Sequence, residues 1–88
     1  MQLENFEKAK KLMGSIEYNK RTMETINKEL ISVSFEPELK YAFVSIGRTN
    51  TIKQDIAVNK DIYVQMLKAQ YQLLIDDTKE IEAEILTL

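Results

Sequence analysis

Two long segments, one at each end of the chain, repeat apolar residues at helical spacing, and this periodicity constrains the fold more than any other feature. The first covers residues 3–30 and the second residues 59–88. Apolar residues that recur every three or four positions form one stripe along an α-helix and leave its other faces to charged residues. We therefore predict two long amphipathic helices that frame the middle of the chain.

The middle segment, residues 31–58, changes from a helical period to alternation of apolar and polar residues, which is typical of half-buried strands. The expected strands cover residues 31–35, 41–46 and 51–58. Pro37 separates the first two because proline lacks a backbone N–H, and residues 47–50 form a polar turn. The sequence thus predicts an α+β fold in a single domain over residues 1–88, with a long N-terminal helix, a short antiparallel β-meander of two or three strands and a long C-terminal helix.

The chain is small and lacks the side chains that usually reinforce small domains. It has 88 residues and contains neither cysteine nor histidine. A core of this size is marginal, and disulfides, metals or oligomerisation often supplement it. Disulfides and thiolate or imidazole metal sites are excluded, and the usual pairs of nucleophile and base are missing. We therefore expect a non-enzymatic protein without cofactor or metal that gains stability as a homo-oligomer, a dimer or higher.

Charge and hydropathy indicate what the chain is not expected to bind. The net charge is −2, so the molecule as a whole does not attract nucleic acid or an anionic membrane. No stretch approaches eighteen apolar residues, and the first six residues lack the pattern of a signal peptide. We expect a cytoplasmic protein without membrane contact and do not expect nucleic acid as a partner.

The second helix is expected to expose more apolar surface than the rest of the chain can cover. It carries the adjacent apolar pairs Met66/Leu67 and Leu73/Leu74. A helix over residues 3–30 is about 42 Å long, whereas strands span only about 17–20 Å, so the helices should extend past the sheet and pair with each other. The remaining apolar edge should bind a second copy or another protein. The expected interface residues are Ile16, Met23, Leu67, Leu74, Ile81 and Ile85.

Two positions interrupt the apolar stripe of the first helix. Asn19 stands where an apolar residue is expected between Ile16 and Met23. Its side chain is either buried, where it would fix the pairing of the helices, or turned to solvent by a slight rotation. Gly14 costs about 1 kcal/mol relative to alanine inside a helix, so it marks either a kink or the close approach of another helix.

The polar turn offers an alternative function. Residues 47–51, followed by Lys53, combine backbone N–H groups, hydroxyls and a guanidinium, which can hold a phosphate or carboxylate. The alternative to docking on a protein is therefore an oligomer that binds an anionic small molecule such as a nucleotide signal. Its expected contacts are Arg48, Lys53, Lys40 and Tyr41. A plain polar hairpin turn explains the same residues.

The order of the segments also suggests a resemblance. Helical segments over residues 3–30 and 59–88 that frame a short β-meander, in a chain rich in Lys, Glu, Ile and Asn, resemble the small uncharacterised accessory proteins of bacteriophage and mobile-element genomes. The resemblance implies a compact, oligomeric protein that acts by binding, in particle assembly, in blocking a host protein or in sequestering a nucleotide signal.

Overall fold

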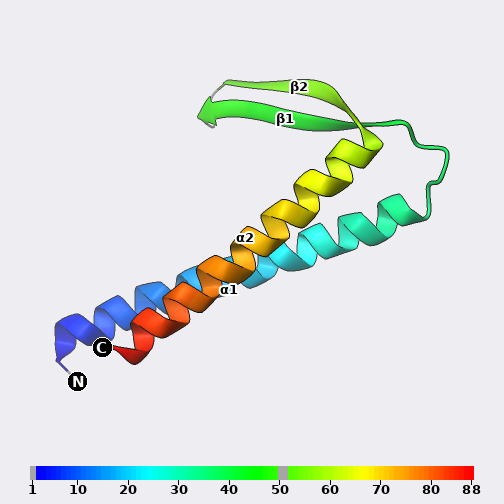
Figure 1. Ribbon diagram of the computed structural model, residues 1–88. Coiled ribbons are helices and arrows are strands. Elements are labelled where there is room, and N and C mark those ends of the chain that lie inside the picture. Colours follow the sequence, from blue (N-terminus) through cyan, green and yellow to red (C-terminus); the bar gives the residue numbers. More distant parts are fainter. Residues whose placement is uncertain (1, 50–51) are drawn as a thin grey trace.

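The chain folds into two long helices joined by a β-hairpin (Figure 1). The structure is a computed structural model that describes residues 2–49 and 52–88, without the side chains of residues 48, 49 and 52. The elements in chain order are α1 (Leu3–Ser34), β1 (Tyr41–Thr49), β2 (Ile52–Asn59) and α2 (Lys60–Leu86). The predicted α+β fold is confirmed.

The helices α1 and α2 lie side by side and antiparallel, so that the two ends of the chain meet (Figure 1). Their facing residues follow a strict spacing of three and four, and all are buried or half-buried. This spacing is the heptad pattern of a coiled coil. The seam consists of Ala9, Leu12, Ile16, Asn19, Met23, Ile26, Leu30 and Val33 on α1 and of Val64, Leu67, Tyr71, Leu74, Thr78, Ile81 and Ile85 on α2.

The predicted strand over residues 31–35 is wrong, because α1 continues to Ser34 and Phe35 is its C-terminal cap. Five residues that alternate between apolar and polar also fit the end of a helix when some of them continue the apolar stripe of that helix. Leu30 and Val33 continue the seam beyond Ile26, and Val33 is only 4 % exposed. Helix packing therefore outweighs the local alternation, and Pro37 prevents the helix from continuing further.

The strands β1 and β2 form a two-stranded antiparallel sheet, so the other two predicted strands are confirmed. The register pairs Val44 with Ile56 and places Ala42, Ile46, Gln54 and Val58 on the same face. Tyr41, Phe43, Ser45, Asp55 and Ala57 lie on the opposite face. β1 extends to Thr49, so residues 47–49 of the predicted turn lie in the strand, and residue 50 lies outside the described residues.

The hairpin joins α2 without any intervening loop. Asn59 ends β2 and caps α2, as its side-chain Oδ1 accepts a hydrogen bond of 2.8 Å from the backbone N–H of Asp61. The backbone N–H of Lys60 donates to the carbonyl of Lys40 over 2.9 Å, and its Nζ donates to the carbonyl of Glu36 over 2.8 Å. These bonds fasten the base of the hairpin to the start of the helix.

The core is thin for a protein of this size. Among the described residues, only Ile26, Val33 and Leu74 are buried hydrophobic residues, and none is fully buried. The radius of gyration is 17.0 Å, whereas a compact chain of this length has about 12 Å. The accessible surface is 7359 Å², about 2,000 Å² more than the roughly 5,400 Å² of a compact monomer of this mass.

Gly14 lies within an uninterrupted α1, and a Cβ atom added there meets nothing within 4 Å. The close approach of another helix is therefore not the reason for this glycine.

Candidate interaction site

A polar layer crosses the middle of the seam. Asn19 is 5 % exposed, and its Nδ2 donates to Asp77 Oδ2 over 2.8 Å and to Thr78 Oγ1 over 3.2 Å. Both hydrogens of the amide group are used. Of the two interpretations of Asn19, the buried one is correct. An asparagine at a seam position fixes helix register because a shift by one turn would leave its amide unpaired.

The antiparallel register that follows from this layer explains the rest of the seam. Counting outward from Asn19 and Thr78 along both helices places Ile16 opposite Ile81 and Met23 opposite Leu74. The six predicted interface residues therefore lie in the contact between the two helices of one chain. Leu74 is buried and the other five are half-buried. Whether their remaining surface also contacts a second copy stays a prediction.

Polar contacts close one flank of the seam. Lys8 Nζ lies 3.4 Å from Glu84 Oε1, and Tyr63 Oη donates to Glu29 Oε1 over 3.1 Å. The ion pair is largely exposed and adds little stability. Partial burial raises the pKa of Tyr63 above its usual value of 10.0, and its hydrogen bond to the Glu29 carboxylate and the charge of that group raise it further. Tyr63 is therefore held in its neutral, donating form.

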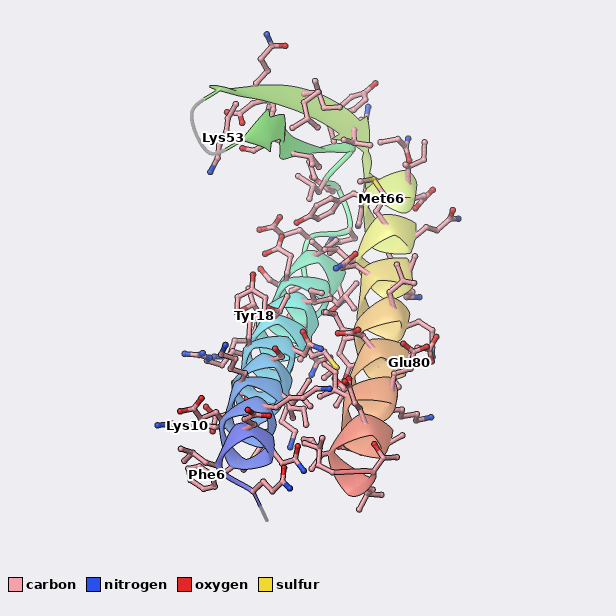
Figure 2. All side chains as sticks on the ribbon, turned by 90° about the vertical axis from the view of Figure 1, so that its left-hand side faces the viewer. Phe6, Lys10, Tyr18, Lys53, Met66 and Glu80 are labelled. Carbon is pink, nitrogen blue, oxygen red and sulfur yellow. The ribbon has the colours of Figure 1, made fainter. Side chains whose placement is uncertain are left out.

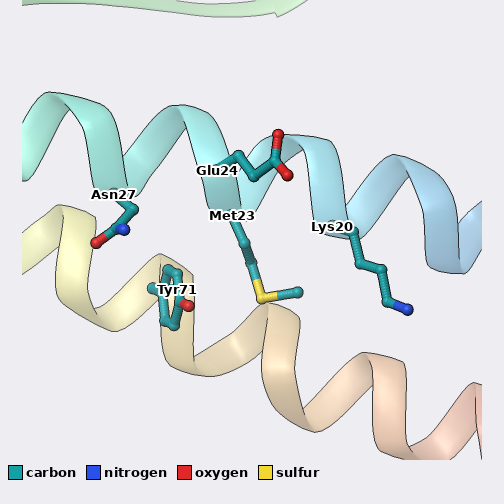
Figure 3. A pocket seen from close by; sticks show the side chains of 5 residues that line it. All are labelled: Lys20, Met23, Glu24, Asn27 and Tyr71. Atoms are coloured by element: carbon teal, nitrogen blue, oxygen red, sulfur yellow. The ribbon is translucent and has the colours of Figure 1, made fainter.

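The opposite flank carries two adjoining hollows between α1 and α2, and Figure 3 shows the larger of these two. Their volumes are about 260 and 220 Å³, and Asn27 and Tyr71 line both. We call this surface the groove flank. It is lined by Lys20, Met23, Glu24, Asn27, Leu30, Lys68 and Tyr71. Figure 3 shows Met23 and Lys20 reaching from α1 toward α2, Tyr71 on α2, and Glu24 turned away from α2.

Of the groove flank, only Met23 was among the predicted interface residues. Lys20, Asn27 and Lys68 are polar and lie next to the seam rather than in it, so an analysis of the apolar stripe misses them. The heptad pattern could have identified these residues. In two paired helices, the positions next to the seam form the lining of any groove between the helices.

Large apolar side chains are exposed on both helices, and not chiefly on α2 as expected. On α1, Leu3, Phe6, Met13 and Tyr18 are all more than half exposed. Leu67 and Leu74, which were expected to contribute to the surplus, lie in the seam instead. On α2 the exposed large apolar residues are Ile62, Met66, Leu73 and Leu86.

The predicted contacts for an anionic ligand lie at two ends of the hairpin. Lys40 and Tyr41 stand at its base, where Tyr41 pairs with Asn59, whereas Lys53 lies beyond the Ile46–Gln54 pair near the tip (Figure 2). Six residues of strand separate the two ends by about 20 Å. One small ligand therefore cannot contact both ends of the same chain. The side chain of Arg48 lies outside the described part of the structure.

Within residues 2–49 and 52–88, no three acidic side chains gather closely enough to hold a metal ion. Neither of the two described helices is apolar enough over a sufficient length to cross a membrane.

Comparison of the chain with models of protein families, with curated proteins and with solved structures gives no match.

Proposed function

We propose that this chain is a non-enzymatic, oligomeric interaction protein that docks on another protein through its paired helices α1 and α2. The observation that supports the proposal is the surplus of about 2,000 Å² of exposed surface per chain, relative to a compact monomer of equal mass. A surplus of this size on each chain matches what subunits of permanent complexes bury, since such interfaces cover about 2,000–5,000 Å² in total.

The groove flank is the surface that fits an additional helix best. Met23, Leu30 and Tyr71 give it an apolar floor, because they belong to the seam and are only half covered by the pairing of α1 with α2. Lys20, Glu24 and Lys68 supply charges of both signs at the rim. An amphipathic helix that lays its apolar side into such a groove is a common mode of protein recognition.

A first experiment measures the mass of the purified chain by light scattering at micromolar concentration. We expect a mass of two chains or more. A well-folded monomer contradicts the oligomeric part of the proposal.

A second experiment identifies the docking partner. A photo-reactive amino acid replaces Asn27 in the groove flank, and cells that express the variant are irradiated. We expect one discrete adduct with another protein, identified by mass spectrometry. The matched control carries the same group at Lys11, which is exposed on another side of α1. Equal adducts from both positions, or none from Asn27, contradict docking at the groove flank.

A further inference from the structure

The strand β2 forms an outer edge of the hairpin that the rest of the chain leaves open. In Figures 1 and 2, β2 lies on the side of β1 that faces away from the helices. Apart from β1, the only described element that β2 contacts is α2, into which it passes at Asn59. Lys53, Asp55 and Ala57 are exposed along β2. The edge is therefore accessible to a further strand.

The register of the sheet decides which backbone groups of β2 point outward. The N–H of Lys60 donates to the carbonyl of Lys40, and hydrogen-bonded and non-hydrogen-bonded pairs alternate along an antiparallel ladder. The backbone groups of the even-numbered residues of β2 therefore bond to β1. Those of the odd-numbered residues point away from β1, and these residues include Lys53, Asp55 and Ala57. Within the described part of the chain, no backbone group outside the hairpin pairs with them.

The sequence of this edge is complementary to itself in the antiparallel direction. Residues 52–56 read Ile-Lys-Gln-Asp-Ile. Two copies of this segment that pair about Gln54 place Lys53 of each copy opposite Asp55 of the other. Opposite charges that face each other across two strands stabilise the pair, and like charges destabilise it. The edge of one copy therefore matches the edge of a second copy in charge.

The charges also select this register over its neighbours. A shift by two residues in one direction places Asp55 opposite Asp55 of the other copy, and a shift in the other direction places Lys53 opposite Lys53. A shift by one residue brings outward backbone groups opposite groups that already bond to β1. Charged residues on an edge strand normally keep other strands away. Here the same charges admit one partner strand in one alignment.

We propose that two copies of this chain join β2 to β2 as antiparallel neighbours and form one four-stranded sheet. This inference rests on the proposed function, since it names the surface of self-association. Such a pair has two-fold symmetry and uses the same edge of both copies. A two-stranded hairpin is marginal in water, whereas three or more strands with an apolar face are stable. The half-buried face with Val44 and Val58 becomes one side of the joint sheet in both copies.

The single chain already holds Asp55 in place for this pairing. Ser45 Oγ donates to Asp55 Oδ1 and fixes the carboxylate on its face of the hairpin. A carboxylate has two acceptor oxygens, so Oδ2 can accept from Lys53 of the second copy. Because β2 lies farther from the helices than β1 (Figure 1), the helices of the two copies extend to opposite sides of the joint sheet. The groove flank of each copy is then left for docking on another protein.

The first test reverses one charge at a time. Lys53→Glu gives an edge with two acidic residues, and Asp55→Lys gives an edge with two basic residues. Both positions are exposed, so the helical content measured by circular dichroism should be unchanged. Each variant alone places like charges opposite each other twice, and we expect its dimer dissociation constant to rise at least about tenfold.

An equimolar mixture of these two variants restores both pairs of opposite charge. We expect the mixture to form a one-to-one dimer with about the dissociation constant of the wild type. The matched control is Lys11→Glu, the same change of charge at an exposed position of α1 away from the hairpin. It should dissociate like the wild type.

The second test depends on the register and not on charge. The chain has no cysteine, so Gln54→Cys introduces a single thiol, which lies opposite its own copy in a non-hydrogen-bonded pair. The Cα atoms of such a pair are about 4.5 Å apart, a distance that a disulfide can span. We expect a covalent dimer under mild oxidation. In the control Ala57→Cys, six residues of strand, or about 20 Å, separate the two thiols, and no covalent dimer should form.

The outcomes separate this inference from the proposed function. If the wild type is a folded monomer, self-association fails as a whole, and the inference fails with it. If the wild type is an oligomer, the inference requires both the restored dimer in the mixture and the disulfide at position 54. The absence of either overturns it. The oligomer then uses another surface, and the proposed function stands.

Discussion

Asn19 and Thr78 make the centre of the seam polar, and both side chains are buried. Replacing Asn19 by alanine removes both hydrogen bonds of its amide and leaves the Thr78 hydroxyl without this donor. We expect Asn19→Ala to lower the free energy of unfolding by about 1–3 kcal/mol, measured by urea denaturation at a fixed protein concentration.

The control for this substitution is Asn27→Ala on the same helix. Asn27 is exposed at the groove flank, so its loss should change the free energy of unfolding by less than about 0.5 kcal/mol. Equal effects of the two substitutions would mean that the polar layer adds nothing specific to the pairing of α1 with α2.

Tyr63 makes the stability of the fold depend on pH at the alkaline end. Its pKa is raised above 10.0 by burial first and by Glu29 second, so the folded chain keeps a proton that the unfolded chain has already lost. The stabilisation is complete below about pH 9 and is lost as the pH rises through the pKa of the folded state. We expect the free energy of unfolding to fall between about pH 9 and pH 11, and to fall less in Tyr63→Phe. An identical fall in both proteins would assign the effect to other groups.

Among the helices and strands, the sequence predicts correctly those whose apolar periodicity fits only one type of secondary structure. The stripes of both long helices and the capping residue Asn59 are clear, and α2 begins where they place it. Residues 31–35 are ambiguous because alternation over five residues fits a strand, while Val33 also continues the seam of α1. The choice depends on α2 supplying a partner for Val33, and local patterns do not contain that information.

The candidate site shows the same limit. The predicted interface residues are found from the apolar stripe, and the structure places all six in the seam of a single chain. Residues of the groove flank such as Asn27 and Lys68 lie beside the stripe, and their role as a lining appears only when the two helices are paired.

At the scale of the whole molecule, length and thickness explain why a partner is expected. The chain measures 55 × 29 × 15 Å, and its smallest dimension leaves room for one layer of paired helices. A stable domain usually encloses its core between packed layers. A single layer leaves every seam residue close to water on at least one flank, which accounts for the absence of fully buried side chains among the described residues.

If self-association supplies the missing layer, unfolding and dissociation occur together, and the melting temperature depends on protein concentration. A hundredfold dilution of a dimer removes about 2.7 kcal/mol of stabilisation, or about 1.4 kcal/mol for each chain. For a chain of this size we expect the melting temperature to fall by about 5–10 °C, measured by circular dichroism in cells of different path length. A wild type that melts at the same temperature over the whole range would indicate that the thin fold is stable alone.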